Sequence, residues 1–404
     1  MNRLFLLAGI VLSMAWSQDI DPVKTAREIT SYRTQKVKEA RDAGKPLDSE
    51  ALNKELVSKA REAIKTLDVA KVDPAKALDW ARLAMLAERP DLIRDLCLKY
   101  VDGSPSEKTK FMAQSMLLNA YAELGDTDAI VKTVAAMKPT PAEAASLAIL
   151  VAGSIIMPMQ DRTGTEKTLK FLADVEKKVP FAEPSSGPSK MVGDEARAAI
   201  ADARAHLLLD LGKRTEALEV IDEALAKVDP ASPGVRGLKA ARVQAELLGS
   251  PLPALPVVET LGSFKDFASL KGKVVLVNFF AHWCGSCMVS YPDLAKMYKE
   301  LHPQGLEMVG VTAYYGFYKG VGYDKRDMPK ETELPNLKDF TKEHDLAWPI
   351  VLTERTNYPS FGVISIPTFF VLDKKGNVVR VKIDYSKAGF PEFRKTIESL
   401  MAAK

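Results

Sequence analysis

An unbroken apolar run followed at once by a cysteine pair is the feature that most limits the fold of this chain. Residues 273–280 read KVVLVNFF, and the hexapeptide HWCGSC follows at 282–287. A run so rich in β-branched and aromatic residues is typical of a strand that is covered on both faces. The next residues, CMVSYPDLAKMYKEL, predict a helix. The cysteines therefore lie where a buried strand turns into a helix.

The residues around this strand predict further strands alternating with helices. Strands are expected at GLEMVGVTAY (305–314) and, joined by a turn, within PTFFVLDKKGNVVRVKI (367–383); helices are expected at LKDFTKEHDL (337–346) and PEFRKTIESLMA (391–402). Alternation followed by a terminal hairpin indicates a mixed sheet flanked by helices. We therefore predict an α/β domain over residues 257–404.

The preceding part of the chain has a different pattern. Residues 18–248 are rich in Ala, Leu, Glu, Lys and Arg, with apolar residues at spacings of three and four, which predicts an all-α region. Three prolines within residues 251–256 deny the chain a helix, so we place a linker at 249–256. A chain of 404 residues is long enough for two or three domains.

Two segments of the helical region can be laid over each other. Residues 117–137 and 203–225 each contain an apolar helix ending in Leu-Gly, a short polar turn and a second helix. Gly125 and Gly212 are expected at the turns, where glycine adopts a left-handed backbone at little cost. The pattern resembles tetratricopeptide repeats, which stack helix pairs into a scaffold that holds a partner. An ordinary helical bundle is the alternative.

The first residues are typical of a secretory signal peptide. Arg3 precedes an apolar run of about half the ~20 residues that a membrane span needs, and a small-x-small step ends at Ser17. We expect cleavage after residue 17 and a soluble protein in the periplasm or otherwise exported.

Charge and cysteine content exclude two classes of protein. The 56 basic and 53 acidic residues are interspersed, which argues against nucleic acid as a partner. Three cysteines cannot form a disulfide framework in so long a chain. Cys97 lies among apolar positions at helical spacing and is expected to be a small buried hydrophobe. Cys284 and Cys287 are then available to each other.

The position of the pair predicts reactive thiols. Unpaired backbone N–H groups and the positive end of a helix dipole favour thiolate over thiol. We expect Cys284 to be the exposed nucleophile and Cys287, one helical turn later, to attack the mixed disulfide. A zinc site would draw only on Cys97 and four scattered histidines, and the T-x-x-C pattern of peroxiredoxins is missing. A purely structural disulfide here would close too small a loop to constrain the unfolded chain much. We predict neither a metal nor a cofactor.

Residues 250–404 resemble the TlpA-like thioredoxin-fold thiol-disulfide oxidoreductases. The resemblance is carried by GKVVLVNFFAHWCGSC (272–287), by Pro292 in the following helix and by SIPTFFVLDKKGNVV (365–379). It implies that Pro367 is a cis-proline facing the cysteines and that Ile366 offers backbone groups to an extended substrate. It also implies that Trp283 flanks the reactive sulfur.

Two positions depart from the family pattern. Asn278 stands where thioredoxin has a buried aspartate, and Ser290 stands where several TlpA-like reductases have a glutamate. Neither side chain ionises, so the proton acceptor for Cys287 is unassigned. His282 titrates in the right range in principle and is a candidate for proton transfer, although a packing role is the alternative.

A long connection follows the second expected strand. Residues 314–336 contain Tyr314, Tyr315, Phe317 and Tyr318 and leave the sheet at the edge that carries Cys284. These aromatics are candidates for a lid over a bound polypeptide. The alternative is a loop packed against the helical region.

The sequence thus predicts an exported enzyme that reduces protein disulfides through Cys284 and Cys287. Its partners would be a disulfide-containing protein client, a membrane thiol electron donor and a protein recruited by the helical region. The alternative is a partner-binding helical-repeat scaffold whose thioredoxin-like domain is a docking module with little turnover.

Overall fold

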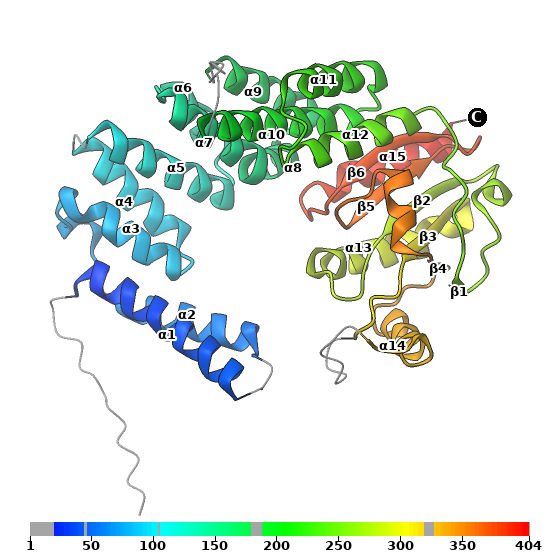
Figure 1. Ribbon diagram of the computed structural model, residues 1–404, viewed down its shortest axis with the longest axis horizontal. Coiled ribbons are helices and arrows are strands. Elements are labelled where there is room, and N and C mark those ends of the chain that lie inside the picture. The colour runs from blue at the N-terminus through cyan, green and yellow to red at the C-terminus, as the bar shows by residue number, and fades with distance from the viewer. Residues whose placement is uncertain (1–19, 44–46, 104–105, 179–187, 319–326, 404) are drawn as a thin grey trace, which may run out of the picture. The chain divides into compact units, whose positions relative to one another are not determined.

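The structure, a computed structural model, falls into two compact units, and the chain passes from the first to the second between Met137 and Lys138. The signal peptide predicted at 1–17 lies outside the described residues, which are 20–43, 47–103, 106–178, 188–318 and 327–403 (Figure 1). The predicted domain boundaries at 248 and 257 stay a prediction. The second unit contains both helices and the whole sheet.

The first unit is helical, as expected for this part of the chain. Its successive helices pack against one another, and Cys97 is fully buried among them; burial raises the pKa of its thiol to about 12, so it is the inert hydrophobe predicted. The helices are α1 (Pro22–Asp42), α2 (Ser49–Ala63), α3 (Ala77–Leu86), α4 (Pro90–Asp102), α5 (Glu107–Leu124) and α6 (Thr127–Ala136).

The second unit begins with further helices, which are α7 (Pro141–Leu150), α8 (Ile156–Thr163), α9 (Thr165–Lys178), α10 (Pro188–Asp210), α11 (Arg214–Lys227) and α12 (Val235–Leu247). A π-helical turn joins α7 to α8. Among the described residues, Pro141–Thr163 is long and apolar enough to cross a membrane by length and composition alone, and 44% of its most apolar window is buried inside the fold.

The glycines expected at turns adopt the left-handed conformation. Gly125 ends α5 with φ 75°, and Gly212 follows α10 with φ 69°. The helix pairs α5–α6 and α10–α11 are therefore present, while their assignment to tetratricopeptide repeats stays a prediction.

The sheet is mixed and has the strand order β1-β4-β3-β2-β5-β6. β2, β3 and β4 are parallel, whereas β1, β5 and β6 each pair antiparallel with a neighbour. The strands are β1 (Glu259–Leu261), β2 (Val274–Phe279), β3 (Leu306–Thr312), β4 (Ile350–Leu352), β5 (Thr368–Leu372) and β6 (Val378–Ile383); the helices of this part are α13 (Gly285–Leu301), α14 (Lys330–Glu343) and α15 (Phe390–Ala402). The predicted fold class, helices followed by a mixed sheet with flanking helices, is confirmed.

Helix α14 begins earlier than the sequence indicates. The sequence predicts a helix from residue 337, but α14 starts at Lys330, so the long connection is shorter than the predicted 314–336. The early start is missed because of Pro335. A proline inside a helix removes a backbone hydrogen bond, so its presence in the sequence argues against a helix there. The buried face formed by Glu333, Leu337 and Phe340 compensates for that loss.

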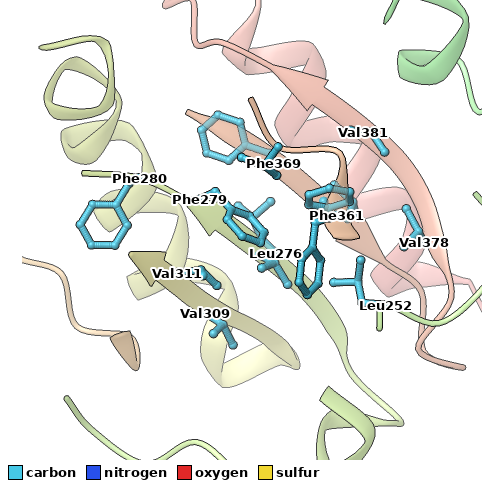
Figure 2. Close-up of a cluster of buried hydrophobic side chains, with 14 of the residues drawn as sticks. Leu252, Leu276, Phe279, Phe280, Val309, Val311, Phe361, Phe369, Val378 and Val381 are labelled. Atoms are coloured by element: carbon cyan, nitrogen blue, oxygen red, sulfur yellow. The ribbon is translucent and has the colours of Figure 1, made fainter. Parts of the chain in front are cut away.

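The core of the second unit continues from the sheet into the helices. β2 is buried at every position, and its Phe279 lies 5.2 Å from the ring of Phe361 (Figure 2). Leu252, from the predicted linker, joins the same cluster (Figure 2). Gly249 N donates to Val378 O at 2.8 Å, so the segment after α12 is bonded to β6.

Candidate functional site

The cysteine pair caps the first turn of α13. Cys284 is the N-cap residue, with extended backbone angles, and its Sγ accepts a hydrogen bond from Cys287 N at 3.2 Å. The two sulfurs form a disulfide with a Cα–Cα distance of 5.2 Å. Cys284 retains 5% exposure and Cys287 none, so Cys284 is the more accessible of the two. The expectation that Cys284 is exposed is wrong for this disulfide form, because the segment that ends at Ile366 packs against its sulfur.

The segment before β5 lies against the reactive sulfur. The Ile366–Pro367 peptide bond is cis, as expected, and Ile366 O lies 3.7 Å from Cys284 Sγ. Thr368 Oγ1 donates to Ser365 O at 2.8 Å and fixes the turn. The structure therefore brings Cys284 to Ile366 and Pro367, although more than 80 residues separate it from them in the sequence.

Trp283 stands at the edge of the same site. Its side chain is 44% exposed, and its ring meets Tyr315 edge to face at 5.4 Å. An exposed tryptophan beside a reactive sulfur gives an apolar surface on which a polypeptide can rest.

The two departures from the family pattern both lie in the buried layer. Asn278 is 1% exposed, and neither polar atom of its side chain has a hydrogen-bond partner among the described residues. Ser290 is fully buried and its Oγ donates to Cys287 O at 2.6 Å. Neither side chain offers an ionisable group to Cys287.

His282 is packed inside an aromatic cluster. Its ring stacks on Tyr318 at 4.8 Å and meets the edges of Phe317 at 5.3 Å and Tyr315 at 5.6 Å. Burial lowers the pKa of His282 to about 4, so the imidazole is neutral at pH 7. Its predicted part in proton transfer stays a prediction, and the contacts themselves are those of a packing residue.

Three of the four predicted lid residues belong to this cluster. Tyr315, Phe317 and Tyr318 surround His282, whereas Tyr314 lies under Lys330 Nζ at 5.2 Å. The connection is thereby held against the cysteine loop in this structure. Its action as a lid stays a prediction, and residues 319–326 lie outside the described part of the chain.

Sequence reasoning missed Glu333. Its carboxylate is buried, with 2% exposure, and accepts hydrogen bonds from Tyr315 N at 2.7 Å and Gly316 N at 2.9 Å. Burial raises its pKa, and the two N–H donors oppose that rise. His282 Nε2 lies 3.9 Å from Glu333 Oε1. The pKa of His282 is lowered and that of Glu333 is raised, so both shifts oppose the charged forms that an ion pair needs. The contact is therefore between a neutral imidazole and a carboxyl group. Its spacing of four and seven from Leu337 and Phe340 is the signal that places it on the buried face.

A groove of about 1100 Å³ opens beside the disulfide. One side is formed by Trp283, Tyr315 and the segment that ends at Ile366. The other side is formed by residues between Pro230 and Val243, and so includes α12 as far as Val243. No pattern in the sequence predicts that this helix lies at the site.

Among the described residues, no three His, Cys, Asp or Glu side chains gather in a way that could hold a metal ion.

Residues 247–397 match the family model described as Redoxin. The thiol-disulfide oxidoreductase ResA of Bacillus thuringiensis subsp. konkukian is 27% identical over 152 residues, which are 37% of this chain and 78% of that protein. ResA of Bacillus subtilis is 31% identical over 134 residues, 33% of this chain and 65% of that protein.

Solved structures similar to this chain include a thiol-disulfide isomerase from Corynebacterium glutamicum, 20% identical, with a TM-score of 0.31 over 38% of this chain and 97% of the other. StoA from Bacillus subtilis is 21% identical, with a TM-score of 0.27 over 35% and 95% of the two chains.

The C-terminal part of the chain therefore matches the Redoxin model and is similar in sequence to proteins named thiol-disulfide oxidoreductases, with the cysteine pair at the start of α13. The predicted resemblance of this part to TlpA-like, thioredoxin-fold thiol-disulfide oxidoreductases is confirmed.

Proposed function

We propose that this protein is an exported enzyme that reduces disulfides in protein clients through Cys284 and Cys287. The observation that carries the proposal is the placement of Cys284 Sγ at the N-terminus of α13, 3.7 Å from Ile366 O. A client strand lying along Ile366 would present its disulfide to Cys284, the more accessible of the two cysteines. Export rests on the pattern of residues 1–17.

The helix N-terminus supports the nucleophile. In the reduced protein, Cys287 N–H and the dipole of α13 stabilise negative charge on Cys284 Sγ and so favour the thiolate over the thiol. The thiolate attacks a client disulfide and forms a mixed disulfide. Cys287 Sγ, buried beneath, then attacks Cys284 Sγ and releases the client as a dithiol.

Two electrons pass from the protein dithiol to the client disulfide in each cycle, and a donor must restore them. For an exported protein this donor is a membrane protein that carries a dithiol. Asn278 and Ser290 do not ionise, so neither accepts the proton of the Cys287 thiol.

The reduction potential of the Cys284/Cys287 couple tests the direction. A value near roughly −270 mV supports a reductase, and one near roughly −120 mV supports an oxidant. The measurement is paired with reduction of a disulfide substrate by wild type and by Cys284→Ser in the presence of a dithiol donor.

A docking module with little turnover is the second candidate, and the uncharged residues at positions 278 and 290 favour it. Equal inactivity of wild type and Cys284→Ser with a competent donor would establish this role in place of the enzyme.

A further inference from the structure

The groove beside the cysteine pair has a second wall that a lone thioredoxin-like domain would lack. Helix α12 supplies Arg236 and Lys239 to it, while the opposite side carries Arg355, Trp283 and Ile366. The groove therefore combines residues of the helical region with residues that contact the reactive sulfur.

The two walls are fixed to each other by close contacts. Gln244 Nε2 in α12 donates a buried hydrogen bond to Gly362 O at 2.8 Å. A Cβ atom at Gly362 would lie 2.3 Å from Ala240 O, so α12 lies against the backbone of the segment that leads to Ile366. The groove is thus a built feature of the second unit.

The charge of the groove is positive. Arg236 and Lys239 lie one helical turn apart and are exposed, and neither forms an ion pair with another described residue. Arg355 lies over the ring of Tyr315 at 5.6 Å, which leaves its guanidinium edge open to a ligand. The described residues that line the groove include no Asp or Glu.

The volume and the lining select the kind of ligand. At about 1100 Å³ the groove lies at the upper end of the ~300–1,000 Å³ range of ligand pockets and has room for a polypeptide segment. Exposed apolar side chains at Trp283 and Ile364 suit an extended chain, and three unpaired cations suit carboxylates. Nucleic acid also carries negative charge but offers no disulfide to Cys284.

We propose that this groove binds an acidic segment of the client polypeptide, adjacent to the disulfide that Cys284 attacks. The proposal rests on the proposed function, since it names the class of client that the oxidoreductase selects. Arg236, Lys239 and Arg355 pair with the carboxylates of the segment, while Trp283 contacts its apolar side chains.

The reaction is an exchange of one disulfide for another. Cys284 thiolate attacks one client sulfur, and the other client sulfur leaves and takes up a proton. Cys287 thiolate then attacks Cys284 Sγ, the mixed disulfide breaks, and the second client sulfur is protonated. The client gains two electrons and two protons, and a dithiol donor later reduces the Cys284–Cys287 disulfide.

Three synthetic peptides test the proposal. Each has one intramolecular disulfide followed by a run of glutamates, glutamines or lysines, and kcat/KM for reduction by the full-length protein is measured with a dithiol donor. We expect the glutamate peptide to exceed the glutamine peptide by roughly tenfold at low salt, and the difference to shrink at high salt. The lysine peptide should be slowest.

Charge selectivity, the ratio of the glutamate rate to the glutamine rate, is the readout in the variants. Arg236→Gln/Lys239→Gln/Arg355→Gln should bring the ratio close to one. The control Lys265→Gln/Lys271→Gln/Lys375→Gln removes three exposed lysines outside the groove and should keep the wild-type ratio. A wild-type ratio near one, or a ratio that survives the triple groove variant, overturns the proposal.

A binding measurement separates this proposal from the proposed function. A fluorescent glutamate peptide without cysteines is titrated with the oxidised wild-type protein and with both triple variants. If the groove variant loses binding while the wild type and the control variant keep it, the groove proposal is supported. If in addition no peptide is reduced, the reductase role fails although the groove proposal stands. Reduction of all three peptides at one rate, with equal binding by all proteins, leaves the reductase role and removes the groove.

Discussion

Asp210 at the end of α10 and Arg380 in β6 form a buried ion pair, with Arg380 Nε 2.7 Å from Asp210 Oδ1. The second carboxylate oxygen of Asp210 accepts hydrogen bonds from Gln160 and Thr165. Burial by itself raises the pKa of Asp210, but the charges of Arg380 and Lys382 outweigh it and hold this pKa below its usual value. The pair therefore joins the helices to the sheet through fully ionised groups.

Replacing Asp210 by Asn should destabilise the second unit by about 3–5 kcal/mol, because Arg380 is left buried without a countercharge. Urea denaturation measures the loss. The double variant Asp210→Leu/Arg380→Met should lose much less, since no charge is then buried. A single variant as stable as wild type would mean that the pair is dispensable.

The same pair has a defined pH dependence. Because the folded-state pKa of Asp210 is lowered, its contribution is present above the unfolded value of ~3.9 and is lost as pH falls through the lowered value. Wild type and Asp210→Asn should therefore converge in stability at strongly acid pH, provided that both remain folded there.

The ion pair also predicts how the chain tolerates truncation. A protein lacking residues 18–137 keeps Asp210, α12 and the whole sheet, and should unfold in one cooperative transition. A protein lacking 18–248 leaves Arg380 without Asp210 and exposes the apolar residues that α10 and α12 cover. We expect it to aggregate or melt without cooperativity, which circular dichroism and calorimetry would detect. Equal cooperativity of the two truncations would contradict this.

The parts of the site that the sequence predicts are those with strong local signals. The run 273–280 specifies β2, and the next residues specify the N-terminus of α13, so Cys284 and Cys287 could be placed without a structure. Pro367 could be placed on the resemblance to a family. For β2 and α13, the residues of the segment itself determine whether it forms a strand or a helix.

The parts that the sequence does not predict depend on contacts between distant segments. Arg236 and Lys239 look like ordinary exposed helix residues, and only the packing of α12 on Gly362 brings them to the cysteines. The spacing of Glu333 from Leu337 and Phe340 indicates burial, but no local pattern predicts that Tyr315 N and Gly316 N are its hydrogen-bond donors. Charged residues at functional sites are hard to find from the sequence because the spacing of apolar residues indicates which positions are buried. It does not indicate which distant residues a side chain contacts.

Gly362 should be the least replaceable glycine near the groove. It has φ 64°, and a Cβ atom there would meet Ala240 O at 2.3 Å. Gly362→Ala should lose at least ~3 kcal/mol, from left-handed backbone strain together with the clash. Gly249 has φ 79° with nothing near its Cβ, so Gly249→Ala isolates the strain and should lose about 1 kcal/mol. Chemical denaturation of the two variants compares these losses, and equal losses would contradict the close packing of α12.

His282 should make the protein less stable in mild acid. Its folded-state pKa of about 4 lies below the unfolded value of ~6.5, so its stabilising contribution is complete above pH ~6.5 and falls as pH drops through about 4. The full loss is roughly 3 kcal/mol. His282→Phe keeps an aromatic ring and removes this titration. The difference in unfolding free energy between variant and wild type, measured at pH 8 and pH 4.5, should shift in favour of the variant at the lower pH.

Glu333 should hold the aromatic connection in place. In Glu333→Gln the amide has one oxygen acceptor, and its NH₂ group takes the place of the second carboxylate oxygen. Either Tyr315 N–H or Gly316 N–H then faces a donor and loses its hydrogen bond. An unsatisfied buried N–H costs about 1–3 kcal/mol, and amide exchange in residues 313–318 should accelerate by about tenfold or more. Glu331→Gln, an exposed change two residues earlier in α14, is the control and should leave exchange unaltered.

The pH dependence of Glu333 has the opposite sign to that of His282. Burial raises the pKa of Glu333 in the folded protein, so folding opposes its ionisation. The contribution of Glu333 to stability is therefore complete below the unfolded pKa of ~4.3 and is lost as pH rises through the raised folded-state pKa. Glu333→Gln cannot ionise and should lack this fall. The unfolding free energies of the two proteins should therefore approach each other as pH increases over that range. A gap that stays constant with pH would mean that Glu333 is already ionised at little cost, held as a carboxylate by its two backbone donors.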